Sequence, residues 1–187
     1  MDVNLSCKCG KVRGILHHAS PSVGTRLVCY CHSCQRFPNH LGAEGVLDEY
    51  GGTDIYQVPI RYVEFTAGRD LLKCLRVTEK GAFRWYSGCC QTPIGNTGPA
   101  ALPVMGVIHT CMDIDNRNSV LGPIRSDING QDALKPLPMD RQRGSRPMII
   151  LRFLSQILIW KLTGKSRPNP VFDASGNPIA EPELLGA

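Results

Sequence analysis

The stretch Cys29-Tyr30-Cys31-His32-Ser33-Cys34 places three cysteines within six residues. Zinc prefers thiolate ligands at about 2.3 Å in tetrahedral geometry, and a C-x-C-x-x-C segment can direct three sulfurs to one point. Cys29 and Cys31 lie on the same face of an extended segment because side chains alternate there. Three thiolates leave the fourth position open, which is typical of a catalytic zinc. The motif therefore predicts a catalytic Zn²⁺ site on Cys29, Cys31 and Cys34, unless a distant cysteine or histidine closes it as a structural knuckle.

Two further cysteine groups predict a second metal site. The segment Cys7-Lys8-Cys9-Gly10 is similar to the first half of a zinc ribbon, and Cys89-Cys90 is the remaining cluster that could complete it. Adjacent cysteines normally point in opposite directions, so Cys89 and Cys90 need a distorted turn to bind one ion. The two isolated cysteines, Cys74 and Cys111, are interpreted as small buried hydrophobic residues.

The composition is that of a globular protein rich in turns. The 187 residues are 42% hydrophobic and 20% charged, with 19 glycines and 14 prolines. A chain of this length can bury a core as one domain with appendages, and the many turn residues favour a β-rich architecture. The first residues show no basic segment followed by an apolar one, so we expect no secretory signal and a cytoplasmic location. In a reducing compartment, clustered cysteines indicate metal binding more often than disulfides.

Short apolar runs separated by turn residues predict a mainly β domain over residues 1–111. The predicted strands are Val12–His17, Thr25–Tyr30, Asp54–Val58, Arg61–Thr66, Leu71–Val77, Phe83–Tyr86 and Val104–His109. Residues 112–146 are rich in Asp, Asn, Gly, Pro and Arg, and we expect them to form a surface connection. Residues 147–187 are expected to contain a basic, apolar helix followed by an extended, proline-rich tail that lies over the surface.

The apolar stretch Met148–Leu162 follows Pro147 and predicts a helix with proline near its first turn. A helix of this length extends about 22 Å, which is short of a hydrocarbon core of about 30 Å. We therefore expect it to pack on the domain or on a second copy of the chain, with binding to a membrane surface as the alternative. Seven basic residues and no acidic residue lie between Arg141 and Arg167, whereas residues 1–140 are nearly neutral. This local excess of charge does not predict specific binding to nucleic acid.

Three sequence blocks together resemble a known family. They are C-x-C-G-x-V-x-G from Cys7 to Gly14, the C-x-C-x-x-C motif, and an aromatic-rich strand that leads into C-x-T-P-I at Cys90. In this order they resemble the glutathione-dependent formaldehyde-activating enzymes, a family that includes centromere protein V, over the range Leu5–Asn96. The resemblance implies a β-tent of antiparallel sheets and a structural zinc on the outer cysteines. It also implies a second zinc on the C-x-C-x-x-C motif, where the family binds or activates a thiol.

The third block departs from the family pattern C-x-x-C-G-[ST]-P. Alignment of Cys90 with the second cysteine of that pattern puts Ser87 at the first cysteine and Gln91 at the glycine. Cys7, Cys9 and Cys90 then match three of the four structural ligands. A local change of the backbone would let Cys89 substitute for the fourth, which is the alternative we favour; otherwise the outer zinc is weakened or absent.

Two classes of function follow from these observations. The resemblance implies a carbon–sulfur lyase that reversibly adds glutathione to formaldehyde and gives S-hydroxymethylglutathione; another small thiol or aldehyde on the same zinc is a variant of this hypothesis. The alternative is a non-catalytic zinc module whose basic C-terminal helix binds a partner or a membrane surface. The complete C-x-C-x-x-C motif favours the first class, and the altered third block and the long extension favour the second. The sequence assigns no function to His17, His18 or His40.

Overall fold

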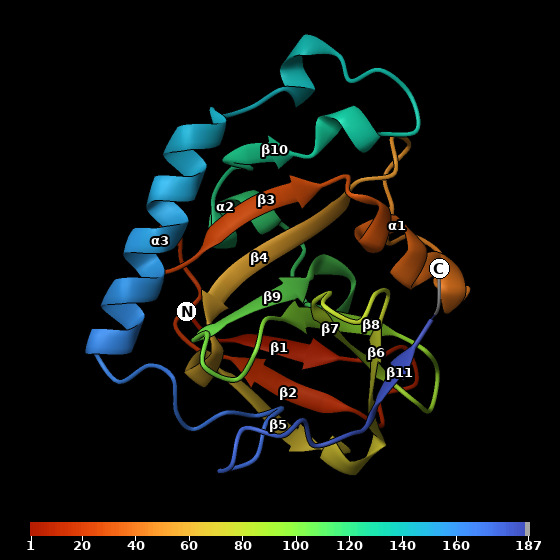
Figure 1. Cartoon of the computed structure of the whole chain (residues 1–187), viewed down its shortest axis with the longest axis vertical. Helices are drawn as coiled ribbons and strands as arrows, with labels where there is room; N and C mark the ends of the chain where they lie inside the picture. Colours follow the sequence, from red (N-terminus) through yellow and green to blue (C-terminus); the bar gives the residue numbers. More distant parts are fainter. Residues whose placement is uncertain (186–187) are drawn as a thin grey trace.

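The computed structural model describes residues 1–185, which fold around two β-sheets (Figure 1). The smaller sheet is antiparallel and has the order β1-β2-β5. Its strands are β1 (Val3–Ser6), β2 (Arg13–Leu16) and β5 (Val63–Ala67). The larger sheet has eight strands in the order β10-β3-β4-β9-β8-β7-β6-β11. The prediction of a mainly β protein with a C-terminal helix and an extended tail is confirmed.

Neighbouring strands of the larger sheet are antiparallel except at the two edges, where β10 pairs with β3 and β11 pairs with β6 in parallel. The strands are β3 (Thr25–Cys29), β4 (Thr53–Pro59), β6 (Leu72–Arg76), β7 (Phe83–Ser87), β8 (Pro93–Thr97), β9 (Val104–Ile108), β10 (Ser126–Ile128) and β11 (Pro182–Leu184). Both edge strands are only three residues long. Short edge strands limit pairing with other chains.

Side chains alternate between the two faces of the larger sheet along its central strands, and they form a separate buried region on each face. Trp85 and Val107 point toward the smaller sheet and join its residues in the main core, whereas Leu75 and Ile108 point to the opposite face. This follows from the two-residue period of a strand, which sends successive side chains to opposite faces. Arg84, the neighbour of Trp85, is therefore on the second face, where the C-x-C-x-x-C motif also lies.

In the described part of the chain, three α-helices flank the larger sheet: α1 (His32–His40), α2 (Arg117–Leu121) and α3 (Arg146–Leu162). Phe37 and Leu41 of α1 pack against the second face of the sheet. The helix α3 runs along one side of the molecule, beside β10 and β3 (Figure 1), and has proline in its first turn as predicted. No helix within residues 1–185 is both long enough and apolar enough to cross a membrane. Single turns of 3₁₀ helix occupy Ile60–Tyr62, Arg69–Leu71, His109–Cys111, Gly130–Asp132 and Met139–Arg141.

The predicted strands are all present with small shifts of their ends, except that Arg61–Thr66 begins as a 3₁₀ turn before β5. Four strands were missed: β1, β8, β10 and β11. The segment 112–146 was expected to be a surface connection, but it contains α2 and contributes β10 to the sheet, with Ser126 opposite Leu27. A three-residue strand carries too little periodicity to be recognised, and its partner lies about a hundred positions earlier.

The tail is extended, as predicted, but the expectation that it lies only over the surface was wrong. Val171 and Phe172 are buried in the main core, at 0% and 4% exposure. The ring of Phe172 meets Trp85 and Phe83 edge to face, with centroids 5.8 and 5.3 Å apart. Such aromatic pairs stabilise a core beyond the area that they bury. The tail therefore closes the core as well as adding β11 to the sheet.

Candidate metal centres

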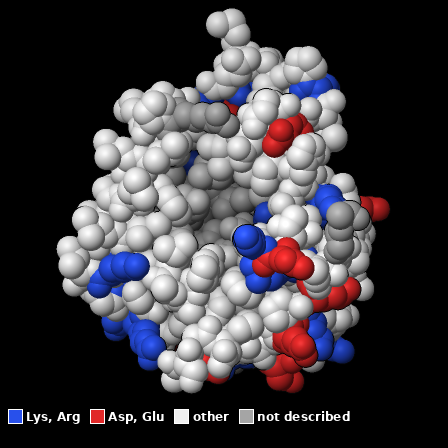
Figure 2. Space-filling view, in the orientation of Figure 1, with Lys and Arg blue, Asp and Glu red and all other residues white. Residues whose placement is uncertain are grey.

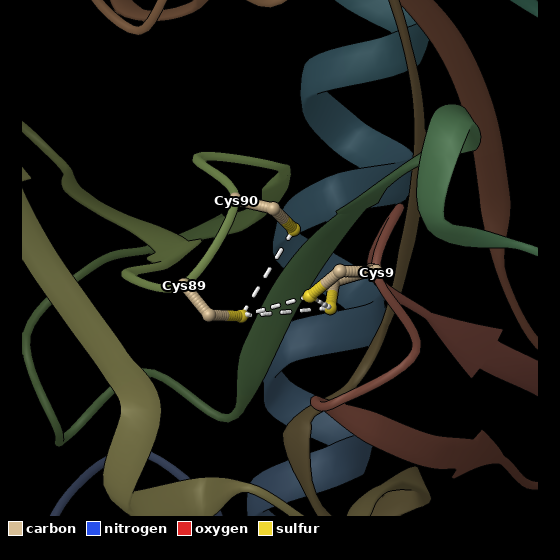
Figure 3. A group of neighbouring side chains, drawn as sticks. Cys9, Cys89 and Cys90 are labelled. Carbon is tan, nitrogen blue, oxygen red and sulfur yellow. Dashed lines mark hydrogen bonds between the residues drawn. The ribbon is translucent and has the colours of Figure 1, made fainter.

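The outer cysteine cluster, formed by Cys7, Cys9, Cys89 and Cys90, lies between the two sheets. Cys7 and Cys9 occupy the loop between β1 and β2 of the smaller sheet, and Cys89 and Cys90 occupy the loop between β7 and β8 of the larger one. Figure 3 shows Cys9, Cys89 and Cys90 pointing toward one another from these two loops. All four sulfur atoms lie within 4.8 Å of one another. An ion bound there would join the two sheets.

The sulfur–sulfur distances match a tetrahedral thiolate site. The Sγ of Cys9 is 3.3 Å from that of Cys89 and 3.6 Å from that of Cys7. The Sγ of Cys89 is 3.8 Å from that of Cys7 and 3.9 Å from that of Cys90. Ligands at about 2.3 Å from a tetrahedral zinc are about 3.8 Å apart. The donor set and its spacing therefore fit a single metal ion.

The loop after β7 allows two adjacent cysteines to point toward the same ion. Residues 88–90 form a turn, and Gln91 has a φ of 54°, in the left-handed region that non-glycine residues seldom occupy. This reversal points the side chains of Cys89 and Cys90 to the same side. Cys89 is thus brought to the position that the sequence left open, and the Ser87 hydroxyl contacts Cys90 and Thr92 instead.

Ser87 has a supporting position in the outer cluster. Its hydroxyl is fully buried, accepts a hydrogen bond from the Thr92 backbone N–H at 3.0 Å, and lies 3.3 Å from the sulfur of Cys90. The Thr92 hydroxyl is 3.2 Å from the same sulfur. Burial alone would raise the pKa of Cys90, but these hydroxyl groups and Cys9 lower that pKa to about 5. The hydroxyls therefore favour the thiolate form that a metal ion requires.

The inner cysteine cluster consists of Cys29, Cys31 and Cys34, whose sulfur atoms also lie within 4.8 Å of one another. Cys29 is the last residue of β3, Cys31 precedes the first turn of α1, and Cys34 lies within that turn. The backbone N–H of Cys34 donates to the carbonyl of Cys31 at 2.9 Å, which closes the turn. Cys29 and Cys31 were expected to share one face of an extended segment, and the structure brings them together at the junction between β3 and α1. His32 lies outside the cluster, with 79% of its side chain exposed near Asp132.

Arg84 approaches the inner cluster from β7. Its guanidinium Nη1 donates a hydrogen bond to the sulfur of Cys34 at 3.4 Å, and the side chain is only 5% exposed. Its Nε is buried without a hydrogen-bond partner in the part of the chain that the structure describes. Among residues 1–185, the guanidinium also forms no ion pair with a carboxylate, and the ring of Phe37 lies 5.9 Å away. A buried cation is costly unless it is paired, so the sulfur cluster is the natural counter-charge.

The thiols of the inner cluster differ in acidity. Hydrogen bonds from Cys29 and Cys34, assisted by the charge of Arg84, lower the pKa of Cys31 to about 2. The same contacts with Cys31 and Cys34, together with burial, raise the pKa of Cys29. The Asn129 side-chain amide also points at the sulfur of Cys29, from 3.6 Å. The three thiols therefore ionise together only with difficulty, because a charge on one sulfur disfavours charge on the others, and ionisation of all three requires positive charge nearby.

The structure brings together all seven cysteines that the sequence predicted as metal ligands, in two groups that could each hold a metal ion. Cys74 and Cys111 are buried apart from both clusters, at 2% and 3% exposure. Arg84 and Asn129 were missed. Neither follows from spacing: Asn129 lies a hundred residues from Cys29, and Arg84 is recognisable only as the charged residue in the alternating run Phe83–Tyr86.

Comparisons with known proteins add the following. A search of curated proteins found no match. Among solved structures, the chain is similar to a Rhodobacter sphaeroides protein from a structural genomics programme, with 16% identity and a TM-score of 0.45. That similarity covers 66% of this chain and 97% of the other. One family model matches residues 1–183. Since the match extends over nearly the whole chain, the protein belongs to this family, DUF6151, a family of unknown function.

Proposed function

We propose that the protein is a zinc-dependent, carbon–sulfur lyase-like protein that binds a small thiol at the inner cluster and adds it reversibly to an aldehyde such as formaldehyde. The observation that carries the proposal is the inner cluster itself: three converging thiols beside the buried cation of Arg84. Thiolate ligands favour zinc among the ions of a cell. The outer cluster, with four ligands, is the structural zinc site of this proposal, and its closed coordination leaves no place for a substrate.

Charge balance supports an open position at the inner cluster. Three thiolates around a Zn²⁺ carry a net charge of about −1, and the Arg84 guanidinium compensates it. Within residues 1–185, the inner cluster includes only three ligating residues. A bound zinc would supply one thing, a lower pKa for the thiol of the substrate. Residues of the chain hold the ligand sulfurs in place: Arg84 donates a hydrogen bond to Cys34, and Asn129 donates one to Cys29.

The proposed reaction needs no oxidant or reductant. The substrate thiol loses its proton, its sulfur forms a bond to the carbonyl carbon, and the electron pair of the C=O bond moves to oxygen. The oxygen takes up a proton and becomes the hydroxyl of a hydroxymethyl thioether. Glutathione with formaldehyde is the pair that the resemblance implies, and a related thiol or aldehyde would follow the same steps.

The metal content of the purified chain tests the proposal. We expect two zinc ions per chain in the wild type and one in Cys31→Ser, with loss of thiol binding. Cys74→Ala, which removes a buried thiol outside both clusters, is the matched control and should keep both ions. Cobalt in place of zinc gives a spectrum that changes when a thiol binds, so binding can be read without turnover. One ion or none in the wild type, unaffected by Cys31→Ser, would overturn the proposal.

A second candidate function rests on the outer face of α3. Seven large apolar side chains there are more than half exposed, from Ile159 at 53% to Leu162 at 78%. The others are Met148, Ile150, Leu151, Leu154 and Leu158. Figure 2 shows that the part of the surface over α3 is mostly uncharged. Exposed apolar area of this extent marks an interaction surface.

We propose that this face binds an anionic membrane surface, because the stretch Arg141–Arg167 contains no acidic residue and Lys161 is exposed on α3 itself. The test is sedimentation with vesicles that contain, or lack, phosphatidylserine. Leu151→Asp combined with Leu158→Asp should abolish binding, whereas Ser155→Asp adds one negative charge to the same helix without removing an apolar contact and should keep most of it. Failure of the wild-type chain to bind, or a dimer that the double variant disrupts in the absence of lipid, would contradict the membrane proposal.

A further inference from the structure

A cavity of about 450 Å³ opens between α3 and the β3–β10 edge of the larger sheet. Leu27 and Ile128 line it from the sheet, and Ile149 and Phe153 line it from α3. Figure 2 shows that this face of the molecule is hollowed near its centre, beside α3. Its volume lies within the range of cavities that hold small ligands.

The cavity adjoins the inner cysteine cluster. Leu27 is two residues before Cys29 on β3, so the two side chains share one face of the sheet. Leu27, Cys29 and Cys34 belong to one buried apolar cluster, against which Ile128 and Cys31 pack. Asn129 lines the cavity and also donates to the sulfur of Cys29 at 3.6 Å. The cavity and the candidate metal site are thus connected through Leu27 and Asn129.

The lining residues that the structure describes are mainly apolar, and none of them carries a charge. Their polar members are the uncharged amides of Gln57 and Asn129, and every other described lining residue is a large apolar one. Glutathione carries two carboxylates and an ammonium group, and none of these would find a counter-charge among the described lining residues. Burial of an unpaired charge is far more costly than burial of an apolar group. The cavity therefore selects against a charged tripeptide and in favour of a hydrocarbon substituent.

The residues that line the cavity lie largely outside the range that carries the family resemblance. The resemblance ends at Asn96, and most of the lining residues come later in the chain. Ile128 is the last residue of β10 and Asn129 follows it, whereas Ile149 and Phe153 belong to α3. We infer that the cavity receives the apolar substituent of a thiol whose sulfur occupies the inner cluster. This inference rests on the proposed function, and it names an alkyl- or aryl-substituted thiol, without charged groups, as the preferred ligand class.

The experiment uses the full chain loaded with cobalt and compares four probes. They are 2-phenylethanethiol, 2-mercaptoethanol, glutathione and 2-phenylethanol, which lacks sulfur. Burial of a phenyl group makes 2-phenylethanethiol bind at least about tenfold more tightly than 2-mercaptoethanol. Glutathione should bind no more tightly than 2-mercaptoethanol. The alcohol should compete with the aryl thiol without producing a sulfur-to-cobalt band of its own.

Two neighbouring substitutions on α3 provide the matched pair of variants. Phe153→Asp places a charge in the cavity and should reduce the affinity for 2-phenylethanethiol at least about tenfold while leaving that for 2-mercaptoethanol unchanged. Leu154→Asp places the same charge on the outer face of the helix, where Leu154 is 57% exposed, and should change neither affinity. Unchanged cobalt spectra and thermal unfolding show that both variants are folded.

The outcomes separate the inference from the function on which it rests. If no thiol alters the cobalt spectrum of the wild type, the proposed function fails and the inference fails with it. If thiols bind but glutathione is preferred, or if Phe153→Asp affects all thiols equally, the inference alone is overturned. The inference is supported if the wild type prefers the aryl thiol and if Phe153→Asp, but not Leu154→Asp, loses this preference.

Discussion

The outer and inner cysteine clusters use similar ligands in different settings. The outer cluster takes two cysteines from each sheet, is partly exposed at Cys9, and is supported by hydroxyl groups. The inner cluster takes its cysteines from one short strand–helix junction and is supported by a buried guanidinium. A metal that joins distant loops links the two sheets directly, whereas one held by a local segment constrains mainly that segment. Under the proposed function, position in the fold, more than the number of thiols, separates the structural site from the chemical one.

The largest expected effect is on the outer cluster. Cys89→Ser should remove one metal ion per chain and lower the free energy of unfolding by more than about 3 kcal/mol, because the link between the sheets is lost. Chemical denaturation with metal analysis measures both quantities. Cys31→Ser is the matched variant at the inner cluster and should lower the unfolding free energy far less, since serine is a favourable residue at the start of a helix. Equal losses in the two variants would remove the distinction.

Arg84→Met should weaken metal binding at the inner cluster by about 10- to 100-fold, because the compensating charge and a hydrogen bond to Cys34 disappear. Binding at the outer cluster should stay the same. Competition with a chelator measures the two affinities. The control is Arg76→Met, which should affect neither site. Arg76 is a half-buried arginine on the adjacent strand β6, and its side chain donates a hydrogen bond to the Gly81 carbonyl. A weakening of both sites by Arg84→Met would indicate general destabilisation.

Ser87→Ala tests the hydroxyl support of the outer cluster. The substitution leaves the buried Thr92 N–H without its acceptor and should lower the unfolding free energy by roughly 1–2 kcal/mol. The inner cluster should be unaffected in its metal affinity. Ser22→Ala, at an exposed serine, provides the baseline for loss of a hydroxyl group. No difference between the two variants in thermal unfolding would show that Ser87 does not support the cluster.

The smallest effect is a pH dependence away from both clusters. The imidazole of His17 lies between Glu64 at 2.9 Å and Asp2 at 3.0 Å, and these carboxylates raise its pKa. A raised pKa in the folded state means that the contact stabilises the protein fully below the pKa of the unfolded chain, near 6.5, and that this stability is lost as pH rises through the folded-state value.

His17→Gln should therefore lower the melting temperature by about 1–2 °C at pH 5.5 to 6 and by less at pH 8.5. Metal binding by the cysteines has the opposite sign, because acid protonates the thiolates. Melting curves of the metal-free chain separate the two contributions. A larger effect of the variant at pH 8.5 would contradict the assignment to His17.

The sequence was sufficient to group the seven cysteines into two clusters that could each hold a metal ion and to predict most of the strands, because cysteine spacing and the two-residue period are local properties. It left Cys89 uncertain, because the left-handed backbone of Gln91 has no sequence signature when glycine is absent. Arg84 could not be assigned to the inner cluster, since its neighbours come from β3 and α1, about fifty residues away. The strands β10 and β11 escaped prediction for the same reason: each is defined by a distant parallel partner.

Those two edge strands have a consequence for the growing chain on the ribosome. The six antiparallel strands between them are complete once Ile108 has been synthesised, but β3 and β6 keep a free edge until β10 and β11 emerge. Long-range pairing of this kind slows folding and leaves edges open to association with other nascent chains. Truncation before Val171 would leave the β6 edge and the aromatic core permanently uncovered. The segment from Val171 to Leu184 thus decides whether the β6 edge of the sheet remains open to pairing with other chains.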